Sequence, residues 1–204
     1  MKATKFIYLI IFILPIIGFS QTIENLDFIS PFHEGLSAIQ KDGKWAFINT
    51  KGIITIDFRE DLVLTKSDDK NYPKFSDGRC LIKQKKEAIS YFGYIDTSGK
   101  TIIKPEFLNA TNFSNGKAIA LELTKDTVAK NKALGRDVVY YRYFEVTINT
   151  AGVVEHYINP KGTNVVLDKD FLRKPPKITS KQIGENLYAM RHKNKTWSII
   201  RIND

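Results

Sequence analysis

The chain has 204 residues, of which 43% are hydrophobic and 12% aromatic, and its formal net charge is +9. This length suits one ordinary domain or a short array of repeats, and the hydrophobic content excludes a chain that is disordered throughout. Acidic residues are interleaved with the basic ones and no block of five or more like charges occurs, which favours solvated faces over one basic segment.

The first 20 residues have the pattern of a secretory signal peptide. Two lysines precede an uncharged apolar run at residues 6–17, and Gly18 and Ser20 supply the small residues of a cleavage site. The run has twelve residues, fewer than the roughly 20 that a membrane-spanning helix needs. We predict cleavage after Ser20 and an exported chain, periplasmic or secreted, with a charge of +7 and no transmembrane segment. The alternative is an uncleaved N-terminal anchor.

The first recurring piece after this segment is Phe-x-x-Gly followed by a strand-like run. It occurs at residues 31–39, 74–82 and 112–120. In the first copy two strand-like runs flank Asp42-Gly43, and Asp-Gly between such runs is a strong signal for a β-hairpin. Each copy therefore predicts antiparallel strands joined by a tight turn.

The second recurring piece is Asn/Asp-Thr-x-Gly, which ends at Gly52, Gly99 and Gly152. Glycine adopts a positive φ without the steric cost of a Cβ atom, and Asn, Asp and Thr side chains can hydrogen-bond the backbone of their own turn. We predict a tight corner with a positive φ at each of these glycines.

The two pieces divide residues 21–204 into three units and a partial capping unit. Their approximate bounds are 31–60, 74–108, 112–158 and 183–204. Trp197 in the last unit occupies the slot of Trp45 in the first, and both tryptophans are expected in the core.

The predicted fold is mainly β. It is an antiparallel meander of three to four degenerate hairpin repeats that form a twisted elongated sheet or a partly closed sandwich. Insertions separate or interrupt the units, and the one in the third unit is expected to hold a short helix around residues 127–134. Pro175-Pro176 predicts an extended connector before the last unit.

The segments FHEGLSAIQKDGKWAFINTKG and FGYIDTSGKTIIKPEF resemble the WG-repeat family, named for a Trp-Gly pair. This pair is Trp45-Ala46 in the first copy, Phe92-Gly93 in the second and Trp197-Ser198 in the last, and it is unrecognisable near Phe144 in the third. The resemblance implies β-rich repeats, frequently in exported or surface-associated bacterial proteins. It implies no general set of catalytic residues.

The positions that define the repeats are predicted to be structural. They are Phe32, Gly35, Trp45, Gly52, Phe75, Gly78, Phe92, Gly93, Gly99, Phe113, Gly116, Gly152 and Trp197.

The aromatic residues of the repeats leave two interpretations open. Trp45 and Phe47 share one side of their strand, as Phe92 and Tyr94 do in the second copy. Such a face could form the core, which we favour, or it could grip an extended glycan or peptide.

The sequence offers no persuasive catalytic, cofactor or metal site. Cys80 occupies the slot of Ser37 and Ala118, so a small, buried and inert thiol is expected, and a single cysteine excludes an internal disulfide. The histidines, His33, His156 and His192, do not cluster at metal-ligand spacing. The acids at Asp42, Asp77 and Asp96 stand where turn chemistry alone explains them.

Three functions remain as hypotheses. The first is an exported, non-enzymatic binding or scaffold protein of the cell envelope that contacts a protein or a glycan through its β-repeat surface. The second is a basic module that binds polyanions in a salt-dependent manner. The third is a hydrolase with a carboxylate pair that folding brings together.

Overall fold

The computed structural model describes residues 22–67, 70–131 and 136–202, so the predicted signal peptide lies outside the described residues. Within them the chain has fourteen strands and no helix. The strands form four antiparallel sheets of three or four strands, and none of these sheets closes on itself. The predicted antiparallel meander of hairpins is confirmed, with a separate sheet for each unit.

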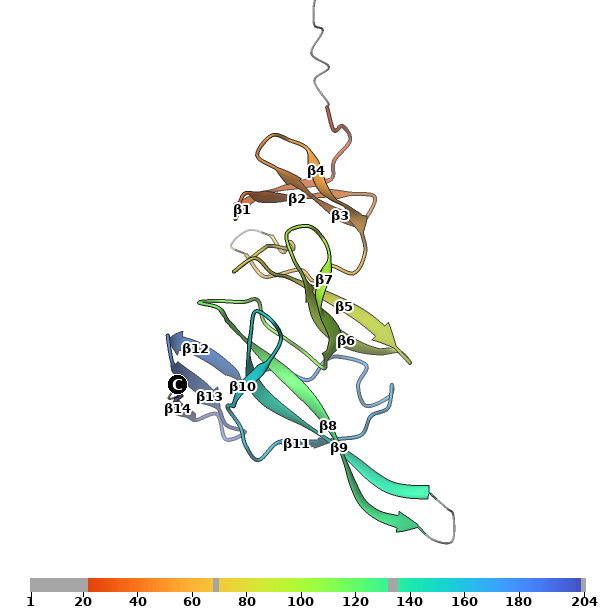
Figure 1. Cartoon of the computed structure of the whole chain (residues 1–204), viewed down its shortest axis with the longest axis vertical. Helices are drawn as coiled ribbons and strands as arrows, with labels where there is room; N and C mark the ends of the chain where they lie inside the picture. Colours follow the sequence, from red (N-terminus) through yellow and green to blue (C-terminus); the bar gives the residue numbers. More distant parts are fainter. Residues whose placement is uncertain (1–21, 68–69, 132–135, 203–204) are drawn as a thin grey trace, which may run out of the picture.

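The first sheet has the order β1-β2-β3-β4, with β1 (Phe28–His33), β2 (Leu36–Lys41), β3 (Lys44–Asn49) and β4 (Ile54–Arg59). The second has the order β5-β6-β7, with β5 (Cys80–Lys86), β6 (Ile89–Ile95) and β7 (Thr101–Phe107). The third sheet contains β8 (Lys117–Asn131), β9 (Arg136–Asn149), β10 (Val154–Tyr157) and β11 (Thr163–Val165). In this sheet β8, β10 and β11 each pair with β9. The fourth has the order β12-β13-β14, with β12 (Ser180–Gly184), β13 (Leu187–Arg191) and β14 (Trp197–Arg201). Figure 1 shows the first three sheets following one another along the long axis, with the fourth beside the third.

Five two-residue turns in the described residues have a positive φ at both central positions, which is the type I′ conformation favoured in hairpins because its twist matches that of the strands. They are Glu34-Gly35, Asp42-Gly43, Asp77-Gly78, Glu87-Ala88 and Asn115-Gly116. Three of them, at Gly35, Gly78 and Gly116, are the turns of the Phe-x-x-Gly pieces. This piece therefore places an acidic or amide residue and a glycine at a left-handed turn.

The three Asn/Asp-Thr-x-Gly corners share one geometry. In the first, the Asn49 side-chain oxygen accepts from the backbone N–H groups of Lys51 and Ile53 at 2.9 and 3.1 Å. The φ angles of Gly52, Gly99 and Gly152 are +76°, +83° and +85°. A further corner of this kind, ending at Gly162 with a φ of +64°, lies in the insertion before the last unit.

The helix expected around residues 127–134 is wrong for the described part of that segment. β8 continues as a strand to Asn131 and pairs with β9, which begins at Arg136. Residues 132–135 lie outside the described residues. The cause is long-range pairing, because the facing run at residues 138–144 is rich in valine and tyrosine, which favour strands.

The core lies between sheets. We call the side of a sheet that points toward the next sheet its forward face, and the opposite side its rear face. Trp45, Phe47 and Ile56 on the forward face of the first sheet pack against Cys80, Ile82 and Ile95 on the rear face of the second. Phe92, Tyr94 and Ile103 on the forward face of the second sheet pack against Ala118, Ala120 and Val146 of the third. Tyr188 of the fourth sheet packs on Ile119 of the third.

Polar contacts repeat at the first two joints. The Glu34 carboxylate accepts from the backbone N–H groups of Asp77 and Gly78 at 2.6 and 2.9 Å. The Asp77 carboxylate in turn accepts from the Gly116 N–H at 2.7 Å. An acidic side chain in the turn of one sheet thus hydrogen-bonds the backbone of the equivalent turn in the next sheet.

Arginines tie the corners in a similar way. Arg59 donates to the Gly99 carbonyl at 3.1 Å, and Arg79 donates to the Thr150 carbonyl at 2.9 Å. Each arginine leaves the end or edge of one sheet and reaches the corner of the next. The arginines therefore bond to backbone carbonyls of the corners. Such bonds do not depend on which side chains the corner residues carry.

The structure assigns a close-packing role to Gly93, the glycine of the second Trp-Gly slot. A Cβ atom at Gly93 would lie 2.7 Å from the carbonyl carbon of Lys104 and the nitrogen of Pro105. The register of β6 on β7 shifts at this point, and the irregular backbone of β7 fills the space of the missing side chain. Glycine is required here because backbone, which cannot move aside, occupies the site.

The aromatic repeat positions differ in their burial. Phe75, Phe92 and Phe113 are buried, whereas Phe32 is 51% exposed on β1. Trp45 is buried at 7% exposure, but Trp197 is 50% exposed, so its expected place in the core is wrong. The physical reason is position in the row of sheets, since no described sheet covers the forward face of the fourth.

Candidate functional site

The thiol of Cys80 is sealed in the core between the first two sheets. Its side chain is buried, and burial raises the pKa of the thiol to about 12, an effect that the nearby Arg59 guanidinium opposes. Ser37 and Ala118, which share its slot, are buried as well. A protonated and inaccessible thiol is a poor nucleophile, so Cys80 contributes packing.

The histidines are separated from one another. His33 bonds the Tyr72 hydroxyl through Nε2 at 2.9 Å, and His192 bonds the Ser198 hydroxyl through Nε2 at 2.6 Å. His156 lies on β10. Among the described residues no group of three His, Cys, Asp or Glu side chains could hold a metal ion.

The turn acids bind backbone. The Asp96 carboxylate accepts from the Ser98 hydroxyl at 2.6 Å and from its N–H at 2.9 Å, and these bonds lower the pKa of Asp96. Asp77 caps the turn at Gly116, and Asp42 occupies a type I′ turn. None of these acids is paired with another in a described pocket, so they do not form the carboxylate pair of the third hypothesis.

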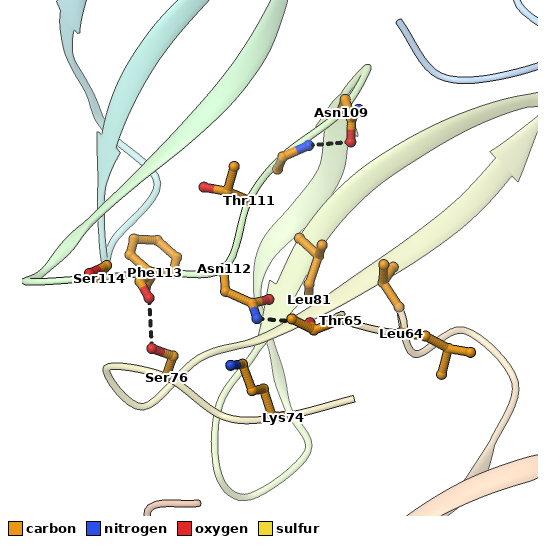
Figure 2. A pocket seen from close by; sticks show the side chains of 12 residues that line it. Leu64, Thr65, Lys74, Ser76, Leu81, Asn109, Thr111, Asn112, Phe113 and Ser114 are labelled. Atoms are coloured by element: carbon orange, nitrogen blue, oxygen red, sulfur yellow. Dashed lines mark hydrogen bonds between the residues drawn. The ribbon is translucent and has the colours of Figure 1, made fainter. Parts of the chain in front are cut away.

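One polar hollow of about 680 Å³ lies where the linkers on either side of the second sheet meet. Figure 2 shows two of its polar side chains, Asn112 and Ser76, bonded to neighbouring protein groups. Asn112 donates to the Thr65 hydroxyl oxygen at 2.8 Å, and Ser76 donates to the Phe113 carbonyl at 2.6 Å. These groups join the two linkers, so we assign this hollow a structural role.

A second hollow, of about 740 Å³, lies between the third and fourth sheets, and we call it the basic groove. Its cationic lining residues come from three separate segments: Lys161 after β10, Lys177 before β12, and Arg191 and Lys193 at the end of β13. His192 also lines it. The four lysine and arginine side chains belong to exposed residues, so their charges face solvent at the rim.

Local structure holds two walls of the basic groove in place. Lys161 stands on the corner that ends at Gly162, where the Asn159 side-chain oxygen accepts from the Lys161 N–H at 3.2 Å. A Cβ atom at Gly162 would lie 2.7 Å from the Phe144 ring, so glycine lets this corner sit against β9. The corner therefore fixes where the Lys161 side chain starts.

Glu145 on β9 fixes the opposite wall. It is buried, and its carboxylate accepts from the Thr179 N–H at 2.8 Å, the Thr179 hydroxyl at 2.7 Å and the Ser180 N–H at 2.9 Å. These bonds anchor the segment that carries Lys177. Glu145 is the one acid among the described residues lining the groove, and its oxygens are occupied by donors, which leaves the groove positive.

A smaller hollow of about 410 Å³ adjoins the groove and shares Lys177, Arg191 and Lys193 with it. Its far side is formed by Trp197, whose ring centre lies 5.1 Å from the Lys181 ammonium and 5.7 Å from the Arg191 guanidinium. Cations beside an exposed aromatic ring can contact both the charges and the apolar faces of a ligand.

Sequence reasoning did not predict this site, because it interpreted the basic residues as solvated faces. The segment at residues 190–197 is visibly basic, but Lys161 and Lys177 are isolated lysines in an insertion. The available signal was the Asn-Pro-Lys-Gly string at residues 159–162, which has the form of a corner. Nothing in the local sequence indicates that this corner faces the fourth sheet.

No helix in the described residues is long and apolar enough to cross a membrane. In comparisons with known proteins, residues 23–45 and 92–122 match the family described as WG containing repeat. No curated protein and no solved structure shows a significant match to the chain. The first matched segment spans β1, β2 and the start of β3, and the second runs from β6 through the Asp96 corner to β8. Both matches fall on the hairpins and corners described above, so these two segments of the chain are similar to WG containing repeats.

Proposed function

We propose that this chain is an exported, non-enzymatic binding module of the cell envelope, and that its basic groove binds an acidic glycan. The observation that carries the proposal is the convergence of Lys161, Lys177, Arg191 and Lys193 on one groove. The export part rests on the signal-peptide pattern of residues 1–20.

The arrangement of the cations favours an extended ligand. A site for one small anion brings several donors to one point, usually with backbone N–H groups among them. Here the charges belong to exposed side chains on separate walls of a hollow, and a second hollow lined by Trp197 adjoins it. A chain of acidic sugars places one charge per residue along such a surface and offers apolar ring faces to Tyr143 and Trp197.

A binding role also agrees with how the candidate reactive groups are used. The Cys80 thiol is buried, and the carboxylates of Asp77, Asp96 and Glu145 accept hydrogen bonds from turn or linker groups. These residues stabilise the fold. The groups left exposed in the groove are cations, which bind acids without needing further chemistry.

The test is a titration with a fluorescein-labelled oligogalacturonate, a linear acidic glycan, monitored by fluorescence anisotropy over a series of salt concentrations. We expect salt-sensitive binding, and we expect Lys161→Ala/Lys177→Ala/Lys193→Ala to weaken it by about tenfold at low salt, because three ionic contacts are lost. The slope of log affinity against log salt should fall by about two.

The matched control is Lys51→Ala/Lys83→Ala/Lys85→Ala, which removes the same charge from exposed lysines of the first two sheets. Its affinity should stay close to that of the unchanged chain. Equal losses in both triple variants, or equal binding of polyglutamate at matched charge, would assign the affinity to net charge and support a general polyanion module. No binding of either polymer would contradict the groove proposal.

A further inference from the structure

Uncovered apolar side chains lie on the forward face of the fourth sheet. Leu187, Trp197 and Ile199 occupy the slots that Leu36, Trp45 and Phe47 occupy in the first sheet. In the first sheet these slots are buried by the second sheet. In the fourth sheet Ile199 is 71% exposed, and Trp197 and Leu187 are also exposed. This face therefore has the residues with which one sheet packs on the next, but no described sheet packs on it.

The rear face of the first sheet corresponds to the face with which the second and third sheets pack on the sheet before them. Ile29 pairs with Ile39 and Phe32 with Ser37, which places them on the side opposite Trp45. Both Ile29 and Phe32 are more than half exposed. Ser37 and Ile39 have the slots of Cys80 and Ile82, and like them they are buried, so the exposed part of the rear face is the β1 edge with Ile29 and Phe32.

The space around the corner glycines also differs between the first sheet and the next two. A Cβ atom at Gly99 would lie 3.3 Å from Ile56 of the preceding sheet, and one at Gly152 would lie 3.0 Å from Ile103. At Gly52 no atom lies within 4 Å of the built Cβ position. At the first sheet the corner is therefore open, and no described sheet precedes it.

The two ends carry opposite charge. Residues 22–60 contain six acidic and four basic side chains, whereas residues 178–202 contain one acidic and five basic side chains. Lys181, Arg191 and Arg201 lie in the strands of the fourth sheet, and Asp27 lies directly before β1 of the first. Opposite charges at the two ends favour their approach and disfavour contact between two like ends.

We propose that the chain associates head to tail with a second copy of itself, the forward face of the fourth sheet packing on the rear face of the first. Glu185 occupies the slot of Glu34, whose carboxylate holds the turn of the next sheet inside the chain. In the pair of copies Glu185 lies within reach of the Glu34-Gly35 turn of the second copy. Because the two surfaces differ, the contact leaves a free end on each copy and adds further copies in a row or ring.

Sedimentation velocity of the chain without its predicted signal peptide, over a concentration series, tests the proposal. We expect the weight-average sedimentation coefficient to rise with concentration. Ile199→Glu blocks the forward face and Phe32→Glu blocks the rear face, so each variant alone should stay monomeric. An equimolar mixture should form dimers and nothing larger, because one variant retains the rear face and the other the forward face.

The control is Phe171→Glu, which changes a strongly exposed aromatic residue outside both faces and should associate like the unchanged chain. Thermal unfolding of each variant checks that it is folded. A monomer at every concentration overturns the proposal, as does a Phe32→Glu variant that still associates, which would indicate pairing of two forward faces. Neither Phe32 nor Ile199 lines the basic groove, so binding of oligogalacturonate by both variants separates this result from that of the proposed function.

Discussion

At the scale of single residues, the Glu87-Ala88 turn differs in sequence from the other described type I′ turns. Both residues have a positive φ, and among the described type I′ turns this one has no glycine. An L-residue in this conformation places its Cβ atom too close to backbone oxygen, which costs roughly 1 kcal/mol or more. The sequence at this turn therefore stores strain that a glycine would remove.

We expect Ala88→Gly to raise the free energy of unfolding by about 1 kcal/mol, as measured by urea denaturation. Ala151→Gly is the matched control, because Ala151 is exposed and does not have a positive φ. That change should leave stability unchanged or lower it slightly, since glycine increases the entropy of the unfolded chain. A loss of stability in Ala88→Gly would show that the alanine side chain makes a contact worth more than the strain.

The buried thiol of Cys80 makes stability depend on alkaline pH. Its pKa is raised from an ordinary 9.0 to about 12, so the unfolded chain releases the proton at a lower pH than the folded chain. The contribution is complete below pH 9 and is lost as the pH rises from 9 toward 12. Between pH 8 and pH 10 we expect the free energy of unfolding to fall by about 1 kcal/mol through this group.

Urea denaturation at pH 8 and pH 10 checks this expectation, with Cys80→Ala as the comparison. Alanine fits the slot, as Ala118 does in the third sheet, and it has no proton to release. The variant should therefore lose less stability than the unchanged chain over that interval. Equal losses would assign the alkaline sensitivity to other groups such as Tyr94, whose pKa is also raised by burial.

At the scale of elements, the corners combine local and long-range requirements. All three predicted corner glycines have a positive φ, which a local sequence pattern can indicate. Their surroundings differ: space is open at Gly52, Ile56 lies close to Gly99, and Ile103 lies closer still to Gly152. Equivalent motifs therefore have unequal tolerance to a side chain.

We expect alanine substitutions to lower stability in the order Gly52, Gly99, Gly152. The first should cost about 1 kcal/mol from the left-handed φ alone, and Gly152→Ala about 2–3 kcal/mol because its Cβ atom also presses on Ile103. Thermal and urea denaturation of the three variants give the ranking. Equal costs would show that the neighbouring isoleucines shift freely, and unchanged stability in all three would contradict the positive φ.

The β8–β9 hairpin shows where local reasoning at this scale is insufficient. The segment from Thr127 contains lysine, alanine and leucine, which are good helix formers, and this composition led to the incorrect helix. Strand pairing with β9 overrides that preference. The same reasoning succeeded at Asp42-Gly43 because there the turn itself determines the pairing.

At the scale of the whole molecule, the two tryptophans test the effect of position in the row of sheets. Trp45 and Trp197 hold the same slot, yet one is buried between two sheets and the other is half exposed. We expect Trp45→Ala to cost about 3–5 kcal/mol of unfolding free energy, as large-to-small core changes do, and Trp197→Ala to cost less than about 1 kcal/mol.

Urea denaturation at a protein concentration low enough to keep the chain monomeric measures both values. The low concentration matters because association through the fourth sheet would bury Trp197 and add to its apparent cost. Trp197→Ala should also lower the affinity for acidic glycan, since its ring borders the hollow beside the basic groove. A large loss of stability in monomeric Trp197→Ala would contradict the exposed position of this ring.

The sequence by itself determined the β class, the hairpins, the corner positions and the likeness to WG repeats, because tight turns depend on a few adjacent residues and their allowed φ angles. Tertiary structure alone decided which equivalent face is covered, and it brought Lys161 and Lys177 to the groove beside Arg191 and Lys193. Burial and charge convergence depend on which sheet lies next to a residue. Repeated sequence slots specify the same local surface everywhere, and only the neighbour in space makes that surface a core or an interface.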